Sequence, residues 1–372
     1  MVTHIQLDGI PSGALVAVAM SGGVDSSVAA GLMVEAGYKV IGITLQLYDH
    51  GAMVNKKGAC CAGQDIYDAR TVADKLGIPH YVLDYESIFK QNVIDDFVDS
   101  YLQGETPIPC VRCNQRVKFR DLLTTSKELG AQALVTGHYV RRIINNDRAE
   151  MHRACDHSRD QSYFLFTTTQ DQLDYLHFPL GGMPKAETRE HARRFGLVVA
   201  DKPDSQDICF VPTGGYAAVV EKFRPGALDP GEIVNQEGQV LGAHQGIINY
   251  TVGQRKGLGV SAAEPLYVIK IDPVTRQVIV GPKEALAKTK LLINEMNWLT
   301  DKADFIEGKN VIVKVRSTQP GLQAHVKVFQ DTQAIIEFST PEYGVSAGQA
   351  CVLYEGDRVL GGGWISREEV GE

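Results

Sequence analysis

The sequence has no apolar run as long as the roughly 20 residues that a membrane-spanning helix needs. Residues 1–20 also lack a basic segment ahead of their short apolar stretch, which Gly and Pro interrupt. We therefore expect this stretch to be a strand and not a signal peptide. These absences predict a cytoplasmic protein with no membrane partner.

Cysteine is scarce, with seven in 372 residues. An odd number in a long chain without a secretory signal argues against a disulfide framework, so we expect reduced thiols. Cys110 and Cys113 form a Cys-x-x-Cys pair, but no second Cys or His pair with zinc-ligand spacing accompanies it. A zinc site is therefore not favoured.

Excess positive charge is also missing, because the net charge is −8. This balance argues against indiscriminate binding to nucleic acid. Three short segments are nevertheless locally basic, at residues 140–148, 189–194 and 253–257. Any polyanionic partner would be recognised by a patch and not by the overall charge.

The first part of the chain alternates buried-strand patterns with amphipathic-helix patterns. This succession predicts an α/β domain with a doubly wound parallel sheet, in which ligands bind at the carboxyl ends of the strands. We expect the helix at 114–130 to begin with Asn114 as its N-cap. The predicted strands are 14–20, 39–47, 80–85 and 132–139, and the predicted helices are 24–37, 64–77, 87–103 and 114–130.

After about residue 212 the helical periodicity fades, and short β-type runs separated by turn residues replace it. The segments "DPVTRQ" (272–277) and "EGDR" (355–358) are typical of hairpin turns. We expect a catalytic domain over 1–212, a small β-rich domain over 213–285 and a β-barrel-like domain over 286–372.

The segment "AMSGGVDSS" (19–27) lies where the first predicted strand ends and a helix begins. Gly22 and Gly23 allow a tight turn that brings backbone N–H groups and the helix N-terminus toward an anion. Asp25 would hold Mg²⁺ against a phosphate. The segment lacks the Lys of a Walker A motif, and it resembles the pyrophosphate loop of ATP pyrophosphatases, which split ATP into AMP and pyrophosphate.

Cys113 directly precedes the predicted helix, and Arg112 and Arg116 are near it in sequence. A helix N-terminus and basic neighbours stabilise a thiolate, so we expect a nucleophile. Cys209 stands in "KPDSQDICFV" (202–211). A thioredoxin-like redox site would leave the ATP loop unexplained, whereas sulfur transfer from a cysteine persulfide uses both the loop and the thiols.

At this point the chain closely resembles the bacterial tRNA-specific 2-thiouridylases of the MnmA type. The resemblance runs nearly end to end and rests on several motifs together: "AMSGGVDSS", "ETPIPCVRCNQRVKF", "VTGHYVR", "RDQSYFLF", "KPDSQDICFV", "TVGQRKGLG" and "GQACVLYEGDRVLGGG". It implies ATP-dependent 2-thiolation of the wobble uridine in the anticodon arm of Lys, Glu and Gln tRNAs. The sulfur would come from a cysteine desulfurase, directly or through relay proteins.

The resemblance also implies roles for individual residues. Cys113 matches the family's nucleophile and Cys209 its persulfide-bearing cysteine. The residues that match the family's ATP site are Ala19, Met20, Ser21, Gly22, Gly23, Val24, Asp25, Ser26, Leu45 and Gly137. The tRNA-contacting positions match His138, Arg159, Asp160, Gln161, Arg316, Ser317 and Gln349, and the segment at the target base matches Ile108, Pro109 and Cys110.

Cys110 departs from the family pattern, because the better-known members carry Asp-x-x-Cys there. Its thiolate would replace the acid/base Asp, or Cys110 has another task. One such task is to hold a 4Fe–4S cluster with Cys113 and Cys209. A competing class is an amide-forming ATP pyrophosphatase that acts on a small metabolite.

Overall fold

The computed structural model describes residues 5–48, 61–204, 208–211 and 215–368. The contacts divide the chain into two compact units. Unit 1 comprises residues 1–92, 110–210 and 357–359, and unit 2 comprises residues 93–109, 211–356 and 360–372. The expected boundary at 212/213 lies outside the described residues. No helix in the described part of the chain is long and apolar enough to span a membrane.

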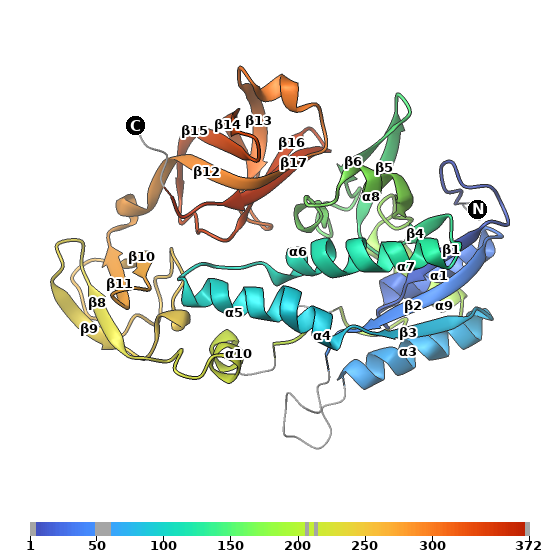
Figure 1. Cartoon of the computed structure of the whole chain (residues 1–372), viewed down its shortest axis with the longest axis horizontal. Coiled ribbons are helices and arrows are strands. Elements are labelled where there is room, and N and C mark those ends of the chain that lie inside the picture. The colour runs from blue at the N-terminus through green and yellow to red at the C-terminus, as the bar shows by residue number, and fades with distance from the viewer. Residues whose placement is uncertain (1–4, 49–60, 205–207, 212–214, 369–372) are drawn as a thin grey trace. The chain divides into compact units, whose positions relative to one another are not determined.

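Unit 1 is built on a five-stranded sheet in the order β3-β2-β1-β4-β7. Figure 1 labels β1 to β4 of this sheet. All its strand pairs are parallel, which confirms the predicted doubly wound sheet. The order reverses between β1 and β4, so their carboxyl ends flank the position where such sheets bind ligands. The strands are β1 (Leu15–Ala19), β2 (Lys39–Gln46), β3 (His80–Asp84), β4 (Ala133–Val135) and β7 (Leu176–His177).

Helices α1 (Val24–Glu35), α3 (Cys61–Leu76) and α9 (Lys185–Arg194) share one hydrophobic core with the sheet. Val16 and Val18 of β1 pack in this core with Val28 of α1 and Val72 of α3, and each of the four is at most 1% exposed. The near-continuous apolar pattern of β1 is explained by this burial, because a parallel strand between helical layers has no solvent-facing side.

The helix that carries the Cys-x-x-Cys pair begins earlier than predicted. It runs through α6 (Pro109–Cys113), the π-helical segment η2 (Asn114–Leu122) and α7 (Leu123–Glu128). The prediction of Asn114 as its N-cap is therefore wrong. Pro109 is the first helical residue, a position that proline favours because its missing N–H would have no partner there. Asn114 is buried, and its Nδ2 donates to the Phe164 carbonyl oxygen at 3.3 Å.

The predicted helix at 87–103 is present as α4 (Glu86–Phe89), a π-helical turn η1 (Lys90–Ile94) and α5 (Asp95–Leu102). An antiparallel hairpin of β5 (Val140–Asn145) and β6 (Arg148–Arg153) follows β4. The shorter helices are η3 (Ser162–Phe164), α8 (Gln170–Tyr175), α10 (Tyr216–Phe223), η4 (Ile247–Asn249), η5 (Lys283–Leu286) and η6 (Lys302–Phe305).

Unit 2 contains two β structures, as the sequence predicted. A four-stranded sheet has the order β10-β11-β8-β9, and a six-stranded barrel of β12-β15-β14-β13-β16-β17 closes by pairing of β12 with β17. The two predicted hairpin turns join β10 to β11 and β16 to β17. The strands are β8 (Gly231–Val234), β9 (Val240–His244), β10 (Tyr267–Asp272), β11 (Gln277–Gly281), β12 (Ala287–Trp298), β13 (Lys309–Lys314), β14 (Leu322–Gln330), β15 (Gln333–Tyr343), β16 (Ala350–Glu355) and β17 (Arg358–Ile365).

Candidate active site

The glycine-rich loop connects the end of β1 to the start of α1 and is braced from within. The Ser21 N–H donates to Ser26 Oγ at 3.1 Å, and Ser27 Oγ donates to the Gly23 carbonyl oxygen at 2.8 Å. Gly22 has φ +75°, and a Cβ there would lie 2.1 Å from the Asp65 carbonyl oxygen. Only glycine fits this position, and the uncapped start of α1 is left open to bind an anion.

Gly137 follows β4 and touches the same loop. A Cβ on Gly137 would lie 2.6 Å from the Ser26 nitrogen and 2.7 Å from the Asp25 carbonyl carbon. The absence of a side chain therefore lets the β4 end and the glycine-rich loop meet backbone to backbone. Two segments that are more than a hundred residues apart in sequence form one floor at the switch point of the sheet.

Two adjoining cavities open over this floor. The smaller cavity has a volume of about 230 Å³, and its wall contains the end of β1, Leu45, Gly137 and His138. The larger cavity has a volume of about 550 Å³, and its wall contains Arg159 and Cys209. Ser21, Asp25, Leu45, Leu47, Lys118 and Gln161 belong to both walls. Of the ten residues predicted to bind ATP, all but Gly22 line one cavity or the other.

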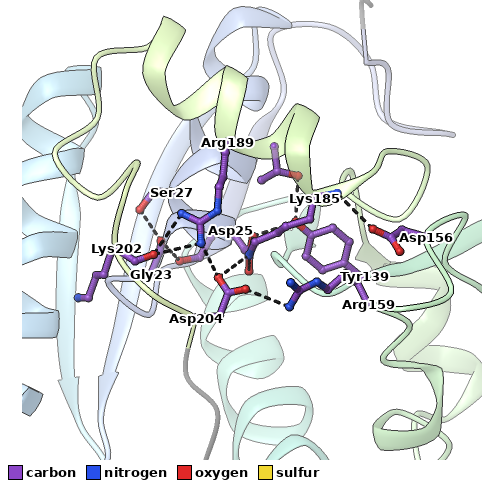
Figure 2. A network of polar contacts seen from close by, with 12 residues as sticks. Gly23, Asp25, Ser27, Tyr139, Asp156, Arg159, Lys185, Arg189, Lys202 and Asp204 are labelled. Atoms are coloured by element: carbon purple, nitrogen blue, oxygen red, sulfur yellow. Dashed lines mark hydrogen bonds and ion pairs between the residues drawn. The ribbon is translucent and has the colours of Figure 1, made fainter. Parts of the chain in front are cut away.

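Asp25 is engaged by cationic and hydroxyl donors (Figure 2). Lys185 Nζ lies 2.7 Å and 2.8 Å from its two carboxylate oxygens, and the Tyr139 hydroxyl donates to Oδ1 at 2.9 Å. Burial, followed by the charge of Asp25, raises the pKa of Tyr139, which keeps the hydroxyl protonated as a donor. Because Lys185 already neutralises the carboxylate, Asp25 does not fit the role of a free magnesium ligand.

The same lysine holds the segment that leads to Cys209. Lys185 Nζ lies 2.9 Å from Asp204 Oδ1, and Arg189 and Arg159 bind the Asp204 carboxylate at 3.0 Å and 3.1 Å. Nearby, Lys202 Nζ donates to the Gly22 carbonyl oxygen at 3.0 Å and to Asp65 at 2.8 Å. Figure 2 shows the Asp204 carboxylate between Lys185, Arg189 and Arg159.

The structure brings the three candidate thiols close enough for their charges to influence one another. Burial raises the pKa of Cys209 to about 12, and the charges of Cys113 and Cys110 add to this rise. Cys209 is nevertheless exposed by surface area, since it lines the mouth of the larger cavity. Burial likewise raises the pKa of Cys113 and of Cys110, whereas the Lys118 charge opposes the rise in both.

The predicted lowering of the Cys113 pKa is therefore wrong. Cys113 is the fifth residue of its helix and is 6% exposed, so no free N–H groups of a helix start face it. The two neighbouring arginines have other partners, because Arg112 donates to Gln115 at 3.0 Å and Arg116 to the Asn92 carbonyl oxygen at 3.2 Å. Desolvation prevails, and the thiol form is favoured.

Among the described residues, no three Cys, His, Asp or Glu side chains are arranged to hold a metal ion. The three cysteines thus do not fit a cluster as they stand, despite their mutual influence.

The residues predicted to contact tRNA in unit 1 differ in their surroundings. Burial lowers the pKa of His138 to about 3, so the ring is neutral, and its Nδ1 lies 2.7 Å from Thr136 Oγ1. Arg159 and Gln161 line the larger cavity, and Gln161 Oε1 accepts from the Tyr139 N–H at 2.8 Å. Asp160 accepts from the Ser162 hydroxyl at 2.8 Å and from the Ala154 N–H at 3.1 Å, which stabilises the turn.

In unit 2, Arg316 and Gln349 line one cavity of about 430 Å³, together with Gly253 of the "TVGQRKGLG" motif. Arg316 Nη2 lies 2.7 Å from Glu342 Oε1, and Gln349 Nε2 donates to the Thr106 carbonyl oxygen at 2.7 Å. Ser317 is not in the lining, but its carbonyl oxygen accepts from Lys314 at 2.7 Å. Ile108 is half-buried and Pro109 is buried.

Several residues of the site did not emerge from the sequence. Lys202 and Asp204 lie within the motif "KPDSQDICFV", but the sequence does not indicate which residues their side chains bind. Lys185 is 160 positions from Asp25, and Tyr139 and Lys118 lie in the motifs "VTGHYVR" and "ETPIPCVRCNQRVKF", which do not indicate what these two side chains contact. Only the spatial arrangement shows that they belong to the site.

Family models match the chain in three parts. Residues 14–213 match the tRNA methyl transferase HUP domain, 218–282 the tRNA methyl transferase PRC-barrel domain and 288–365 the aminomethyltransferase β-barrel domain. A solved structure, NMN synthetase from Francisella tularensis, is 21% identical with a TM-score of 0.34, and the match covers 52% of this chain and 67% of that one.

Two relatives are much closer in sequence. A protein from Rhodospirillum centenum named tRNA-specific 2-thiouridylase MnmA is 62% identical, over 97% of this chain and 94% of its own length. A protein of the same name from Paracoccus denitrificans is 60% identical, with the same coverage of 97% and 94%. The chain therefore belongs to the MnmA family of tRNA-specific 2-thiouridylases, which are tRNA sulfurtransferases.

Proposed function

We propose that this enzyme converts the wobble uridine of Lys, Glu and Gln tRNAs to 2-thiouridine by adenylating the C2 oxygen and then transferring sulfur from a persulfide on Cys209. The observation that carries the proposal is one cavity whose wall contains both the glycine-rich loop and Cys209. Activation by ATP and delivery of sulfur would thus occur in the same space. The enzyme would act in the cytoplasm, where its tRNA substrates are.

In the first step, ATP lies with its phosphates on residues 21–26. The C2 oxygen of the uridine forms a bond to the α-phosphorus, the bond from that phosphorus to the bridging oxygen breaks, and pyrophosphate leaves with the electron pair. The N3 proton is lost to solvent. Since the Asp25 carboxylate is already bound by Lys185, we assign no step to a metal at Asp25, and Mg²⁺ accompanies the nucleotide.

In the second step, the terminal sulfur of the Cys209 persulfide loses its proton and attacks C2. The C2–O bond breaks, and AMP leaves with the electron pair. Cys113 then gives up its thiol proton and attacks the Cys209 sulfur. The bond between the two persulfide sulfurs breaks, the nucleoside sulfur leaves with the electron pair, N3 regains a proton to give 2-thiouridine, and a Cys113–Cys209 disulfide forms. A thiol reductant restores the two cysteines. The sulfur donor is a cysteine desulfurase or a relay protein that carries a persulfide.

The uridine has to leave the stacked anticodon loop, because its C2 oxygen is not accessible within the stack. Arg159 and Gln161 in the wall of the larger cavity suit contacts to phosphate and to a base edge. Arg316 and Gln349 in the unit 2 cavity would bind another part of the anticodon arm. Ile108, Pro109 and Cys110 would approach the target base, and Cys110 would assist as a thiol.

The test is nucleoside mass spectrometry of unmodified Lys tRNA after incubation with ATP, Mg²⁺, a persulfide donor and metal-stripped enzyme. We expect 2-thiouridine with the wild-type chain and none with Cys209→Ser or Cys113→Ser. Cys155→Ser is the matched control, because Cys155 is another exposed free cysteine and should leave the yield unchanged.

The outcomes distinguish sulfur transfer from a Cys209 persulfide from sulfur transfer through an iron–sulfur cluster. Full thiolation by Cys209→Ser would refute the persulfide step. Product only after anaerobic iron–sulfur reconstitution would replace that step with a cluster held by Cys110, Cys113 and Cys209, an arrangement for which the present side-chain positions give no support. Absence of product under both conditions would refute the proposed reaction.

A further inference from the structure

Lys118 lies at the junction of the two cavities. It belongs to the walls of both, and is half-buried on the π-helical segment η2. The smaller cavity holds the ends of β1 and β4, and the larger one holds Cys209. A cation at this junction is within reach of a group that extends from one cavity into the other.

The lysine differs from the other cations of the larger cavity. Lys185, Lys202 and Arg159 each bind carboxylates at 2.7–3.1 Å. Within the described parts of the chain, Lys118 forms no hydrogen bond or ion pair, and its charge acts on the three cysteines and His138. Burial destabilises an ammonium group that has no anionic partner, and an anionic ligand would supply that partner.

The π-helix brings Lys118 close to the cysteine pair. Hydrogen bonds in a π-helix join residues five apart, so Cys113 and Lys118 lie on the same side of the widened helix. In a regular α-helix, with 3.6 residues per turn, residues five apart diverge. The adjacent Phe119 is 1% exposed and also lines the smaller cavity.

We propose that Lys118 is a catalytic residue that binds the α-phosphate of the nucleotide in both steps of the reaction. This inference rests on the proposed function, in which the α-phosphate stands between the nucleotide and the sulfur donor. Lys118 stays protonated and forms no covalent bond. It stabilises the negative charge on the α-phosphate as pyrophosphate leaves, and again as AMP leaves with the electron pair of the C2–O bond.

The test compares AMP with adenosine, which differ only in that phosphate. We measure the dissociation constants of both ligands, by competition with a fluorescent ATP analogue, for the wild-type chain, Lys118→Gln, Lys118→Arg and Lys127→Gln. Loss of a charged hydrogen bond typically costs 10- to 100-fold in affinity, so Lys118→Gln should bind AMP about 10- to 100-fold more weakly and adenosine as before. Lys118→Arg should retain most of the AMP affinity. Lys127 is an exposed lysine of the same continuous helix, and its variant should match the wild type.

Equal AMP affinity in Lys118→Gln and the wild type would overturn the proposal. So would an equal loss for AMP and adenosine, because that result indicates a distorted cavity. If wild-type enzyme makes 2-thiouridine while either of these results holds, only the role of Lys118 fails. If the wild-type chain binds neither nucleotide, the ATP step and the role of Lys118 fail together.

Discussion

At the scale of single residues, the cysteines show how burial and accessibility differ. Cys209 presents surface to the larger cavity, yet the surrounding protein disfavours its charged form. A thiol in this state resists alkylation and oxidation at neutral pH, since the thiolate is the reactive species. Cys209 should therefore react slowly with electrophiles at neutral pH.

We expect alkylation of Cys209 by iodoacetamide to accelerate about tenfold for each pH unit from 7 to 10. The reason is that the pKa is raised to about 12, and the thiolate fraction rises tenfold per unit below the pKa. Peptide mass spectrometry measures the rate, with free cysteine as the comparison. A rate that levels off below pH 8 would contradict the raised pKa.

Lys118 illustrates what sequence patterns miss at this scale. Its position was visible beside the cysteines, but the regular period of 3.6 residues places it away from the Cys113 face. The π-helical spacing that brings the two together has no clear sequence signal. Similarly, the Asp25–Lys185 contact joins residues 160 positions apart, and neither residue's local sequence specifies the other.

At the scale of elements, residues 202–204 form a strap against the glycine-rich loop, which Lys202 binds directly and Asp204 binds through Lys185. Burial acts to raise the pKa of Asp204, but its hydrogen bond with Lys185 and the charges of Lys185, Arg189 and Arg159 outweigh burial and lower it. The carboxylate is thus ionised and shared by three cations. Removal of the Asp204 carboxylate would leave these three cations with fewer anionic partners, and Asp25 would remain bound to Lys185.

Asp204→Asn should lower the free energy of unfolding by about 1–3 kcal/mol, the usual cost of leaving buried charged groups without a partner. It should also reduce 2-thiouridine formation, because Lys185 and Arg159 in the wall of the larger cavity lose the carboxylate that positions them. Urea unfolding and nucleoside analysis measure the two effects.

Asp201→Asn is the matched control. Asp201 forms an ion pair with Arg193 at 3.0 Å, but its side chain is 82% exposed, so the expected change is below about 0.5 kcal/mol. An Asp204→Asn enzyme as stable and as active as this control would show that the strap is dispensable.

At the scale of the whole molecule, the order of elements was predictable and their exact ends were not. Buried β1 and β2 were recognisable because parallel strands read as continuous apolar runs. The sequence pattern does not reveal β12 (Ala287–Trp298), since Thr289, Lys290 and Glu295 interrupt its apolar residues at exposed positions. The start of the helix at Pro109 was missed because Asn114 also resembles a cap.

Two buried histidines should make the free energy of unfolding depend on pH in the acidic range. Burial lowers the pKa of His138 and of His177 to about 3, and a nearby cation, Lys118 or Arg142, adds to each shift. Between pH 6.5 and 3 the unfolded chain binds protons that the folded chain does not, so stability falls as pH falls. Each histidine contributes a slope of up to about 1.4 kcal/mol per pH unit.

Urea unfolding at pH 6.5, 5.5 and 4.5 measures this slope. His177→Gln should reduce the slope by up to about 1.4 kcal/mol per unit, because one of the two protonation sites is gone. His157→Gln should leave it unchanged, since the His157 side chain is 58% exposed. An identical slope in the wild type and His177→Gln would contradict the prediction.

The glycine-rich loop is held between two backbones, with the Asp65 carbonyl on one side of Gly22 and Gly137 against Ser26 on the other. A loop confined in this way has little conformational entropy to lose when a nucleotide arrives. Little of the binding energy is therefore consumed in ordering the chain.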